Sequence, residues 1–225
     1  MALPDHVGRS RAAYGGSAAR YVEAVGASLS DRFETAEDRA MLAALVDLAP
    51  SDGWFLDAGC GPGRVARHLA DGGSAVVGVD VAPAMVAAAR AAHPDLGFAE
   101  ATLTDLPVAD ASLAGVASWY SVITTPPSGL DEIWRELRRA LAPGGAALVA
   151  FQSGAGERVE RPDAYGTGVD LVLYRHDVEE VRRGLVAAGL VVRSVRCREA
   201  ALEAETTPQA FVLASRPAAG AGRFA

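Results

Sequence analysis

A glycine-rich turn is the part of the sequence whose residue types and spacing point most directly to chemistry. Gly59, Gly61 and Gly63 follow a short apolar run and precede a helical pattern that begins at Arg64. Glycine permits a tight turn and leaves bare backbone, so a ligand can lie against the main chain beside a helix N-terminus. The dinucleotide-binding pattern G-x-G-x-x-G is not met, because position 64 is arginine. Asp57, just before the turn, suits a cationic ligand group better than a pyrophosphate.

A second acidic residue stands at the end of the next apolar run. Asp80 follows residues 75–79, and a carboxylate at that place in a parallel sheet can accept both ribose hydroxyls of a nucleoside. Each feature alone is also typical of an ordinary strand-to-helix turn with a capping aspartate. Together, at this spacing, they predict a nucleoside-containing ligand.

The chain resembles the class I S-adenosylmethionine-dependent methyltransferases, and within them the small type-11-like bacterial enzymes. The resemblance rests on five segments that occur in the order of the family's motifs. They are the glycine turn 57–63, the run 76–80 with its acid, the Asp-Leu-Pro segment 105–110, the Trp-Tyr-Ser sequence 119–121 and the Leu-Ala-Pro-Gly-Gly stretch that ends at 145.

This resemblance implies S-adenosyl-L-methionine as the cofactor. It sets the methionine part against residues 59–63 with Asp57 nearby, the ribose on Asp80, and the adenine between Val81, Met85 and residues 101–103. The full set of cofactor-binding residues that it implies is Asp57, Ala58, Gly59, Cys60, Gly61, Gly63, Asp80, Val81, Met85, Thr102, Leu103, Ser118, Tyr120 and Tyr21.

Three positions depart from the family pattern. Thr102 stands where many relatives carry an aspartate toward the adenine amino group, and its hydroxyl is a weaker acceptor. Ala82 replaces a serine that would cap the next helix, a loss of about 1 kcal/mol. Thr124 stands where close relatives often carry a histidine, which puts a histidine mechanism at that position in doubt.

Methyl transfer is an in-line displacement that needs alignment and exclusion of water, and needs a base only if the nucleophile must lose a proton. Tyr120, with Ser121, lies where the fourth strand should end. Its ordinary pKa of about 10 makes it a positioning group rather than a base. His176 precedes a helix and is either a general base or a helix-entry residue. Tyr120 and His176 are the catalytic candidates, Tyr14 and Tyr21 could fold over the cofactor, and no metal site is predicted.

Short apolar runs alternate with helical segments, which predicts a parallel sheet covered by helices on both faces. Runs 190–195 and 210–214 have no helix between them and should pair antiparallel. With the resemblance, we expect a Rossmann-like, doubly wound, mostly parallel seven-stranded sheet with an antiparallel C-terminal hairpin. Strands are expected at 54–58, 75–79, 97–101, 113–120, 146–151 and 171–175, and helices after Thr35 and Asp177 and at 64–70, 83–92 and 130–141.

We expect one methyltransferase domain over residues 1–225. It comprises a helical cap (1–50), a cofactor-binding half (51–152) and a substrate-side half (153–225). Residues 1–30 show only weak helical periodicity, and the charged, glycine-rich stretch 153–168 is predicted to be a long loop or lid.

Composition excludes several classes of function. The formal net charge of −7 argues against a nucleic-acid partner, and no apolar run is long enough to span a membrane. All 21 basic residues are arginine, which removes lysine chemistry. Cys60 and Cys197 lack metal-type spacing and should be free thiols. A cytoplasmic protein, monomeric or homodimeric, is expected.

These observations favour methyl transfer from S-adenosyl-L-methionine to an O, N or C nucleophile of a small molecule, secondary metabolites included. The alternative is an S-adenosylmethionine-binding protein that does not methylate, such as a cyclase or a regulatory binder, since fold does not fix function. A nicotinamide-dependent reductase is disfavoured by the failed glycine spacing.

Overall fold

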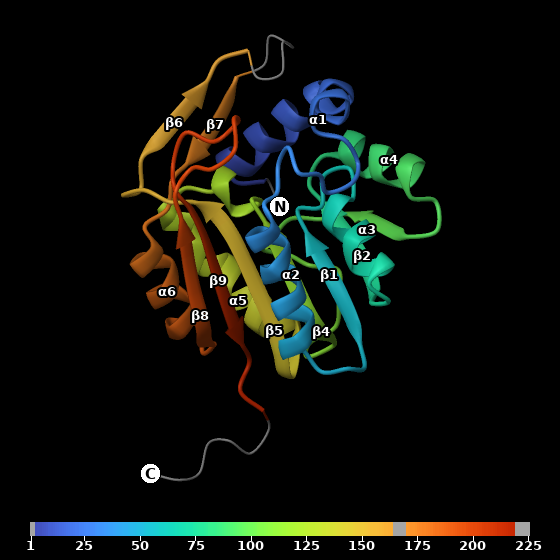
Figure 1. The fold of residues 1–225 in the computed structure, drawn as a ribbon, viewed down its shortest axis with the longest axis vertical. Coiled ribbons are helices and arrows are strands. Elements are labelled where there is room, and N and C mark those ends of the chain that lie inside the picture. The colour runs from blue at the N-terminus through green and yellow to red at the C-terminus, as the bar shows by residue number, and fades with distance from the viewer. Residues whose placement is uncertain (1–2, 164–169, 219–225) are drawn as a thin grey trace.

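The computed structural model of the chain describes residues 3–163 and 170–218. Its centre is a seven-stranded sheet in the order β3-β2-β1-β4-β5-β9-β8 (Figure 1). The strands are β1 (Trp54–Ala58), β2 (Ala75–Asp80), β3 (Gly97–Glu100), β4 (Leu113–Trp119), β5 (Leu141–Gln152), β8 (Val191–Arg198) and β9 (Gln209–Ser215).

The sheet is parallel from β3 to β5, and β9 runs antiparallel to both β5 and β8. The predicted mostly parallel sheet with an antiparallel C-terminal hairpin is therefore confirmed. The chain can reverse directly between β8 and β9 because no helix has to cross from one to the other. β5 begins earlier than the expected residue 146, because the chain enters the strand as soon as the preceding helix ends at Ala140.

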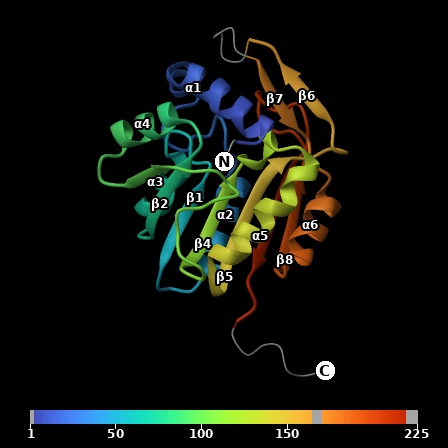
Figure 2. The ribbon, with the colours of Figure 1, turned by 180° about the vertical axis from the view of Figure 1, so that it is seen from behind.

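Helices cover both faces of the sheet (Figures 1 and 2). Side chains of α2 (Ala36–Leu48), α3 (Arg64–Asp71) and α4 (Pro83–Ala92) pack in one apolar cluster. Those of α5 (Leu130–Ala140) and α6 (Val178–Ala187) pack in another. Successive strand residues point to opposite faces, so Phe55 belongs to the first cluster and Leu56 to the second.

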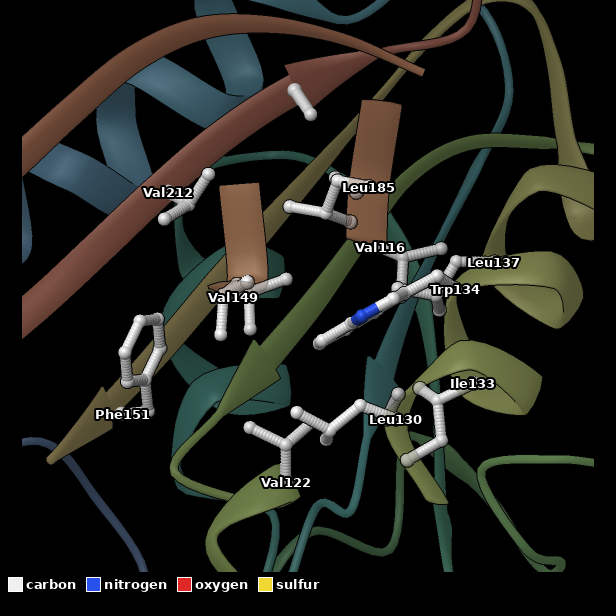
Figure 3. Packing of buried hydrophobic residues seen from close by; sticks show 14 of the residues in the cluster. Val116, Val122, Leu130, Ile133, Trp134, Leu137, Val149, Phe151, Leu185 and Val212 are labelled. Carbon is white, nitrogen blue, oxygen red and sulfur yellow. The ribbon is translucent and has the colours of Figure 1, made fainter. Parts of the chain in front are cut away.

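The second cluster is built around Trp134 of α5, which is 1% exposed (Figure 3). Val116 and Val149 from the sheet and Leu185 from α6 lie around its ring. The bare α-carbon of Gly184 faces the indole, since a Cβ there would lie 2.7 Å from Trp134 Cδ1. This packing fixes α5 and α6 against the sheet face opposite α2.

The N-terminal segment forms a longer helix than its sequence predicts. α1 (Asp5–Val25) packs against α4, β7 and the short helix η1 (Val122–Thr124). α2 begins at the expected cap, where Thr35 Oγ1 accepts from Asp38 N and Asp38 Oδ2 accepts from Thr35 N. Only α1 serves as a cap, because α2 packs on the sheet against β4, β5 and β9.

The predicted loop or lid over 153–168 contains a strand that the sequence did not indicate. β6 (Arg158–Arg161) pairs antiparallel with β7 (Leu171–Tyr174), so this segment is one arm of a hairpin beside the main sheet. The charged residues of β6 concealed the strand, because a hairpin arm with both faces near solvent carries little apolar pattern. Residues 164–168 of the predicted loop lie outside the described residues.

Two further predictions concern the cysteine thiols and membrane-spanning segments. Cys60 is a buried free thiol and Cys197 an exposed one, as expected. Within residues 3–163 and 170–218, no helix is both long and apolar enough to cross a membrane.

A buried ionic cluster ties the N-terminal part of the chain to its end. Both carboxylate oxygens of Asp38, which is 1% exposed, accept from the Arg198 guanidinium at 2.7 and 2.8 Å. Arg198 also donates to both oxygens of Glu205 at 2.6 and 2.7 Å. Such a cluster is costly to break, because removing one partner leaves a buried charge without compensation.

We therefore expect Asp38→Ala to lower the free energy of unfolding by about 3 kcal/mol, measured by urea denaturation. Glu179→Ala is the matched control, since Glu179 also forms a paired contact with an arginine, Arg182, but on the surface of α6. Its loss should lower the free energy of unfolding far less, because solvent screens an exposed ion pair. Equal losses in the two variants would contradict a stabilising role for the buried cluster.

Candidate functional site

The glycine turn is hydrogen-bonded to the end of the neighbouring strand. The amides of Gly59 and Cys60 both donate to the Val79 carbonyl at 2.8 Å, and the amide of Gly61 donates to Asp80 Oδ2 at 2.9 Å. The carboxyl ends of β1 and β2 are thereby joined into one surface. Ligands of open parallel sheets bind at this edge.

The three glycines serve different purposes. Gly59 has φ +80°, and a Cβ there would lie 2.2 Å from Ser121 Cβ, so close approach to the β4 end requires glycine. Gly63 packs against Phe98 and His93 in the interior. Gly61, with φ +51°, has nothing within 4 Å of a Cβ position, so its bare backbone faces open space. Only Gly61 presents the open cradle that the sequence predicted.

Asp80 is held as a fixed acceptor. Its Oδ1 accepts from Ala82 N at 2.9 Å while Oδ2 accepts from Gly61 N, and each carboxylate oxygen retains capacity for another donor. Burial raises the pKa of Asp80, and the backbone amides of Ala82 and Gly61 oppose that rise. A hydroxyl-bearing ligand can therefore complete the coordination of this carboxylate.

A cavity of about 1040 Å³, counted with its opening to solvent, lies above this edge. Its wall includes nine of the residues that the sequence predicted for the site. They are Tyr21, Gly59, Gly61, Asp80, Val81, Met85, Thr102, Leu103 and Tyr120. The structure therefore brings together groups from α1, from the ends of β1, β2, β3 and β4, and from α4.

Six predicted residues do not reach the cavity wall. Ala58, Cys60 and Gly63 are structural parts of the turn or the strand before it. Ser118 is 1% exposed, and its Oγ lies 2.7 Å from Ser121 Oγ, so it supports a wall residue from behind. The remaining two, Asp57 and His176, have their own partners inside the protein.

Asp57 serves the fold. It is 1% exposed, and its Oδ2 accepts from Ala66 N at 2.9 Å, which satisfies a free amide in the first turn of α3. Burial raises the pKa of Asp57 to about 7, and the Ala66 amide lowers it only in part. The expectation of a cationic ligand group beside Asp57 does not hold, because this carboxylate is buried, is bonded to α3 and is not part of the cavity wall.

His176 is buried away from the cavity. It is 1% exposed, and its Nε2 lies 3.1 Å from the Val122 carbonyl, while its ring stacks on Tyr174 at 6.5 Å between centroids. Burial lowers its pKa. Of the two earlier interpretations, helix entry fits this placement, and contact with a substrate does not.

Tyr120 lies on the wall in a strained backbone conformation, with φ +57°. Its ring meets Trp119 edge-on at 5.7 Å between centroids. Burial raises the pKa of Tyr120 well above 10, and the Asp38 carboxylate raises it further. The hydroxyl therefore stays protonated and can act as a donor but not as a base.

Sequence reasoning missed much of the wall that α1 supplies. His6, Val7 and Ser10 were missed, and they line the cavity from the same helix as the predicted Tyr14 and Tyr21. Their spacing of three, four and seven residues is the available signal, since such residues share a helix face. Polar and glycine residues between them weakened the apolar period. The other lining residues are Ala101, Thr104, Trp119, Ser121, Ile123, Thr124, Thr125 and Ile133.

The segment that this chain shares with known proteins includes the glycine turn and Asp80. A family described as "Methyltransferase domain" matches residues 55–145, which contain the glycine turn and Asp80. A malonyl-acyl-carrier-protein O-methyltransferase from Pseudescherichia vulneris is 31% identical over 116 residues, 51% of this chain and 45% of that protein. Residues 55–145 therefore form a domain of the class I S-adenosylmethionine-dependent methyltransferase family.

Further relatives of this methyltransferase differ in what their names say they act on. N-demethylindolmycin N-methyltransferase from Streptomyces griseus is 35% identical over 100 residues, 42% of each chain. The chain spans less than half the length of these relatives.

Solved structures share the fold of this methyltransferase at low identity. Magnesium protoporphyrin IX methyltransferase from Synechocystis PCC 6803, solved with bound S-adenosylmethionine, has a TM-score of 0.71 at 17% identity and covers 96% of this chain and 99% of its own. A cyclase, SpnF, has a TM-score of 0.72 at 18% identity over 93% and 95%.

The cofactor of this family, S-adenosyl-L-methionine, fits the groups that the cavity offers. The Asp80 carboxylate suits a diol, the bare Gly61 backbone permits close approach, and Met85 with Leu103 supplies apolar surface for a base. Among the described residues, no group of three or more His, Cys, Asp or Glu side chains could hold a metal ion.

The placement of Asp57 predicts a stability effect that depends on pH. Its pKa is raised from 3.8 in the unfolded chain to about 7 in the fold, so the folded state binds the proton more tightly. The stability that Asp57 contributes is therefore fully present below about pH 4 and is lost as pH rises through 7.

Asp57→Asn keeps an oxygen for the Ala66 amide and does not titrate. Relative to this variant, we expect wild-type unfolding free energy to fall by up to about 4 kcal/mol between pH 4 and pH 8, measured by urea denaturation. Parallel stability curves for the two proteins would show that Asp57 keeps an ordinary pKa.

Proposed function

We propose that this protein transfers a methyl group from S-adenosyl-L-methionine to an O, N or C nucleophile of a small molecule. The observation that carries the proposal is the junction of Asp80 and the bare Gly61 backbone on one cavity surface in a chain of this family. This junction offers a charged acceptor beside a surface without side chains. A nucleoside joined to an amino acid needs both.

Each part of the cofactor contacts a different set of residues on the cavity wall. Asp80 accepts the ribose hydroxyls, and Gly59 and Gly61 lie against the methionine part. Val81, Met85, Thr102 and Leu103 hold the adenine, and Tyr21 covers the cofactor from α1. When bound, S-adenosyl-L-methionine supplies an electrophilic methyl group: its carbon–sulfur bond breaks as the acceptor's new bond forms, and the bonding pair stays on sulfur.

The residues of the chain orient the reactants and exclude water, and they form no covalent bond with them. α1 covers the cavity and excludes water, which strengthens the polar contacts inside it. Tyr120 and Ser121, at the end of β4, lie beyond the proposed methionine site and can orient an acceptor. Alignment of this kind can supply much of the rate of a displacement.

A small-molecule acceptor is supported by the cavity and the charge. Binding clefts for small ligands have volumes of roughly 300 to 1,000 Å³. Such clefts combine apolar side chains with a few polar groups, and this cavity does so with Met85 and Leu103 beside the Asp80 carboxylate. The net charge of −7 disfavours a nucleic acid. A single-domain, cytoplasmic protein, monomeric or homodimeric, stays a prediction.

The alternative of a cofactor-binding protein that does not methylate is tested by the same assay. Incubation with cofactor labelled in its methyl group and a panel of phenols, amines, carboxylic acids and enols should yield a labelled product. Binding of the cofactor without any labelled product across the panel would favour the alternative.

Asp80→Ala should weaken cofactor binding about tenfold to a hundredfold, because a charge-assisted pair of hydrogen bonds contributes roughly 1.5–3 kcal/mol. Isothermal titration calorimetry measures the affinity, and circular dichroism checks the fold. Asp95→Ala is the control, since this exposed carboxylate pairs with Arg67 on the surface. An Asp80→Ala variant with wild-type affinity would refute the ribose assignment.

Gly61→Val should abolish cofactor binding, because its side chain would fill the open space over the turn. The control is Gly73→Val, between α3 and β2. Gly73 also has a positive φ, +90°, and open space around its Cβ position. Both variants carry comparable backbone strain. If the two variants bind the cofactor equally well by calorimetry, the ligand does not lie on residue 61.

A further inference from the structure

His6 differs from the other titratable side chains on the cavity wall. The lining residues that titrate are His6, Tyr14, Tyr21, Asp80 and Tyr120. Imidazole alone among these groups has an ordinary pKa near neutrality. Burial raises the pKa of Tyr21 and Tyr120, and Asp80 is engaged with the backbone amides of Gly61 and Ala82. His6 is thus the side chain on this wall that can exchange a proton near pH 7.

His6 lies in the first turn of α1, and Tyr21 lies near the other end of this helix. Both residues line the cavity. The first turn of α1 is fixed there by Ser10 Oγ, which donates to the His6 carbonyl at 3.0 Å. The imidazole faces the bare α-carbon of Gly129, where a Cβ would lie 3.6 Å from Cε1 and 3.7 Å from Nε2. Gly129 closes the short helix η2 (Pro127–Gly129), which leads into α5.

The ring nitrogens are available for a ligand. Within the described part of the chain, neither His6 nitrogen has a hydrogen-bond partner, whereas His93 Nε2 lies 2.9 Å from the Ala27 carbonyl and His176 Nε2 contacts the Val122 carbonyl. A second, narrow cavity borders His6 on its other side and is lined also by Arg9, Thr124 and Asp170. His6 therefore borders both cavities.

The charges around His6 favour its neutral form. Burial and the Arg9 guanidinium lower its pKa below 6.5, and the carboxylates of Glu132 on α5 and Asp5 on α1 oppose this only in part. Asp170, before β7, is a further charged residue that lines the second cavity with His6. A neutral imidazole carries a lone pair that can accept a proton.

We propose that His6 is the base that takes the proton of the methyl acceptor, and that the acceptor is a phenolic or enolic hydroxyl. This inference rests on the proposed function. In the step, the acceptor O–H bond breaks and its proton moves to an imidazole nitrogen of His6. The oxygen forms its bond to the methyl carbon, whose former bonding pair remains on sulfur as a neutral thioether. The imidazolium then releases the proton to water.

The chemistry selects this acceptor class. A phenol has a pKa of about 10, within reach of an imidazole in a general-base step, whereas an alkyl hydroxyl is far less acidic. A carboxylate needs no base, because it is already ionised at pH 7. Other polar wall residues at this end are the hydroxyls of Ser10, Thr124 and Thr125, which can orient a neutral hydroxylated ligand.

The test compares the pKa of His6 in two complexes by NMR titration of the imidazole. S-Adenosylmethionine carries a positive sulfonium and S-adenosylhomocysteine a neutral sulfur. If His6 faces the reacting methyl group, its pKa should be lower by about one unit in the first complex, since a unit charge within several ångströms acts on it. His68 on α3, away from the cavity wall, is the internal control and should titrate alike in both.

The His6→Gln variant assigns the resonance and gives a second readout. It should bind S-adenosylhomocysteine with an affinity within about threefold of wild type, because the imidazole serves the acceptor side. Equal His6 pKa values in the two complexes, or a tenfold loss of affinity in this variant, would overturn the proposal for His6 alone. Failure of the wild type to bind either compound by calorimetry would overturn the proposed function as well.

Discussion

The hydrogen bonds between the glycine turn and the end of β2 are the interaction on which the site depends. The Val79 carbonyl accepts two amides of the turn, and the Asp80 carboxylate accepts a third. Parallel pairing of β1 and β2 alone would align the strands but would leave the turn free to adopt other conformations. Because Asp80 both fixes the turn and presents the carboxylate for which we propose a ribose, the ligand surface is formed before a ligand arrives.

Charged groups support this surface from behind rather than lining it. Arg64, at the start of α3, pairs with Glu34, donates to the Ser28 carbonyl and lies over the Phe33 ring. These contacts fasten the segment between α1 and α2 to the helix that follows the turn. Asp57 satisfies the first turn of that helix from the strand side. The cavity wall itself carries few charges, which suits a reaction in which positive charge is dispersed.

The sheet and most of its helices could be predicted from the sequence, because burial on both faces leaves a clear pattern of apolar runs. α4 begins and ends at the residues that Pro83 and His93 indicate. The hairpin β6–β7 could not be predicted in the same way, since Arg158, Glu160 and Arg161 gave it a loop-like composition. Its pairing depends on contacts with β7, which a local pattern does not contain.

The cavity residues at the strand ends could be predicted from the sequence, whereas most of those on α1 could not. Gly61 and Asp80 stand at fixed offsets from predicted strand ends, so sheet topology brings them together. Whether Asp57 faces the cavity or α3 depends on the path of the turn in space, and the residue type is compatible with either. The contribution of His6 depends on how α1 crosses the sheet edge, and nothing local to residues 1–30 encodes that crossing.

The small residues by which α1 is anchored have a consequence for ligand exchange. Its buried residues are Ser10, Ala13, Ser17 and Ala18, which let the helix lie close to its neighbours but bury little apolar area. A helix anchored in this way can move away from the cavity in a local opening, whose free energy is well below that of global unfolding. The spent cofactor can then leave through a transient displacement of one helix, while the seven-stranded sheet and both of its apolar clusters stay intact.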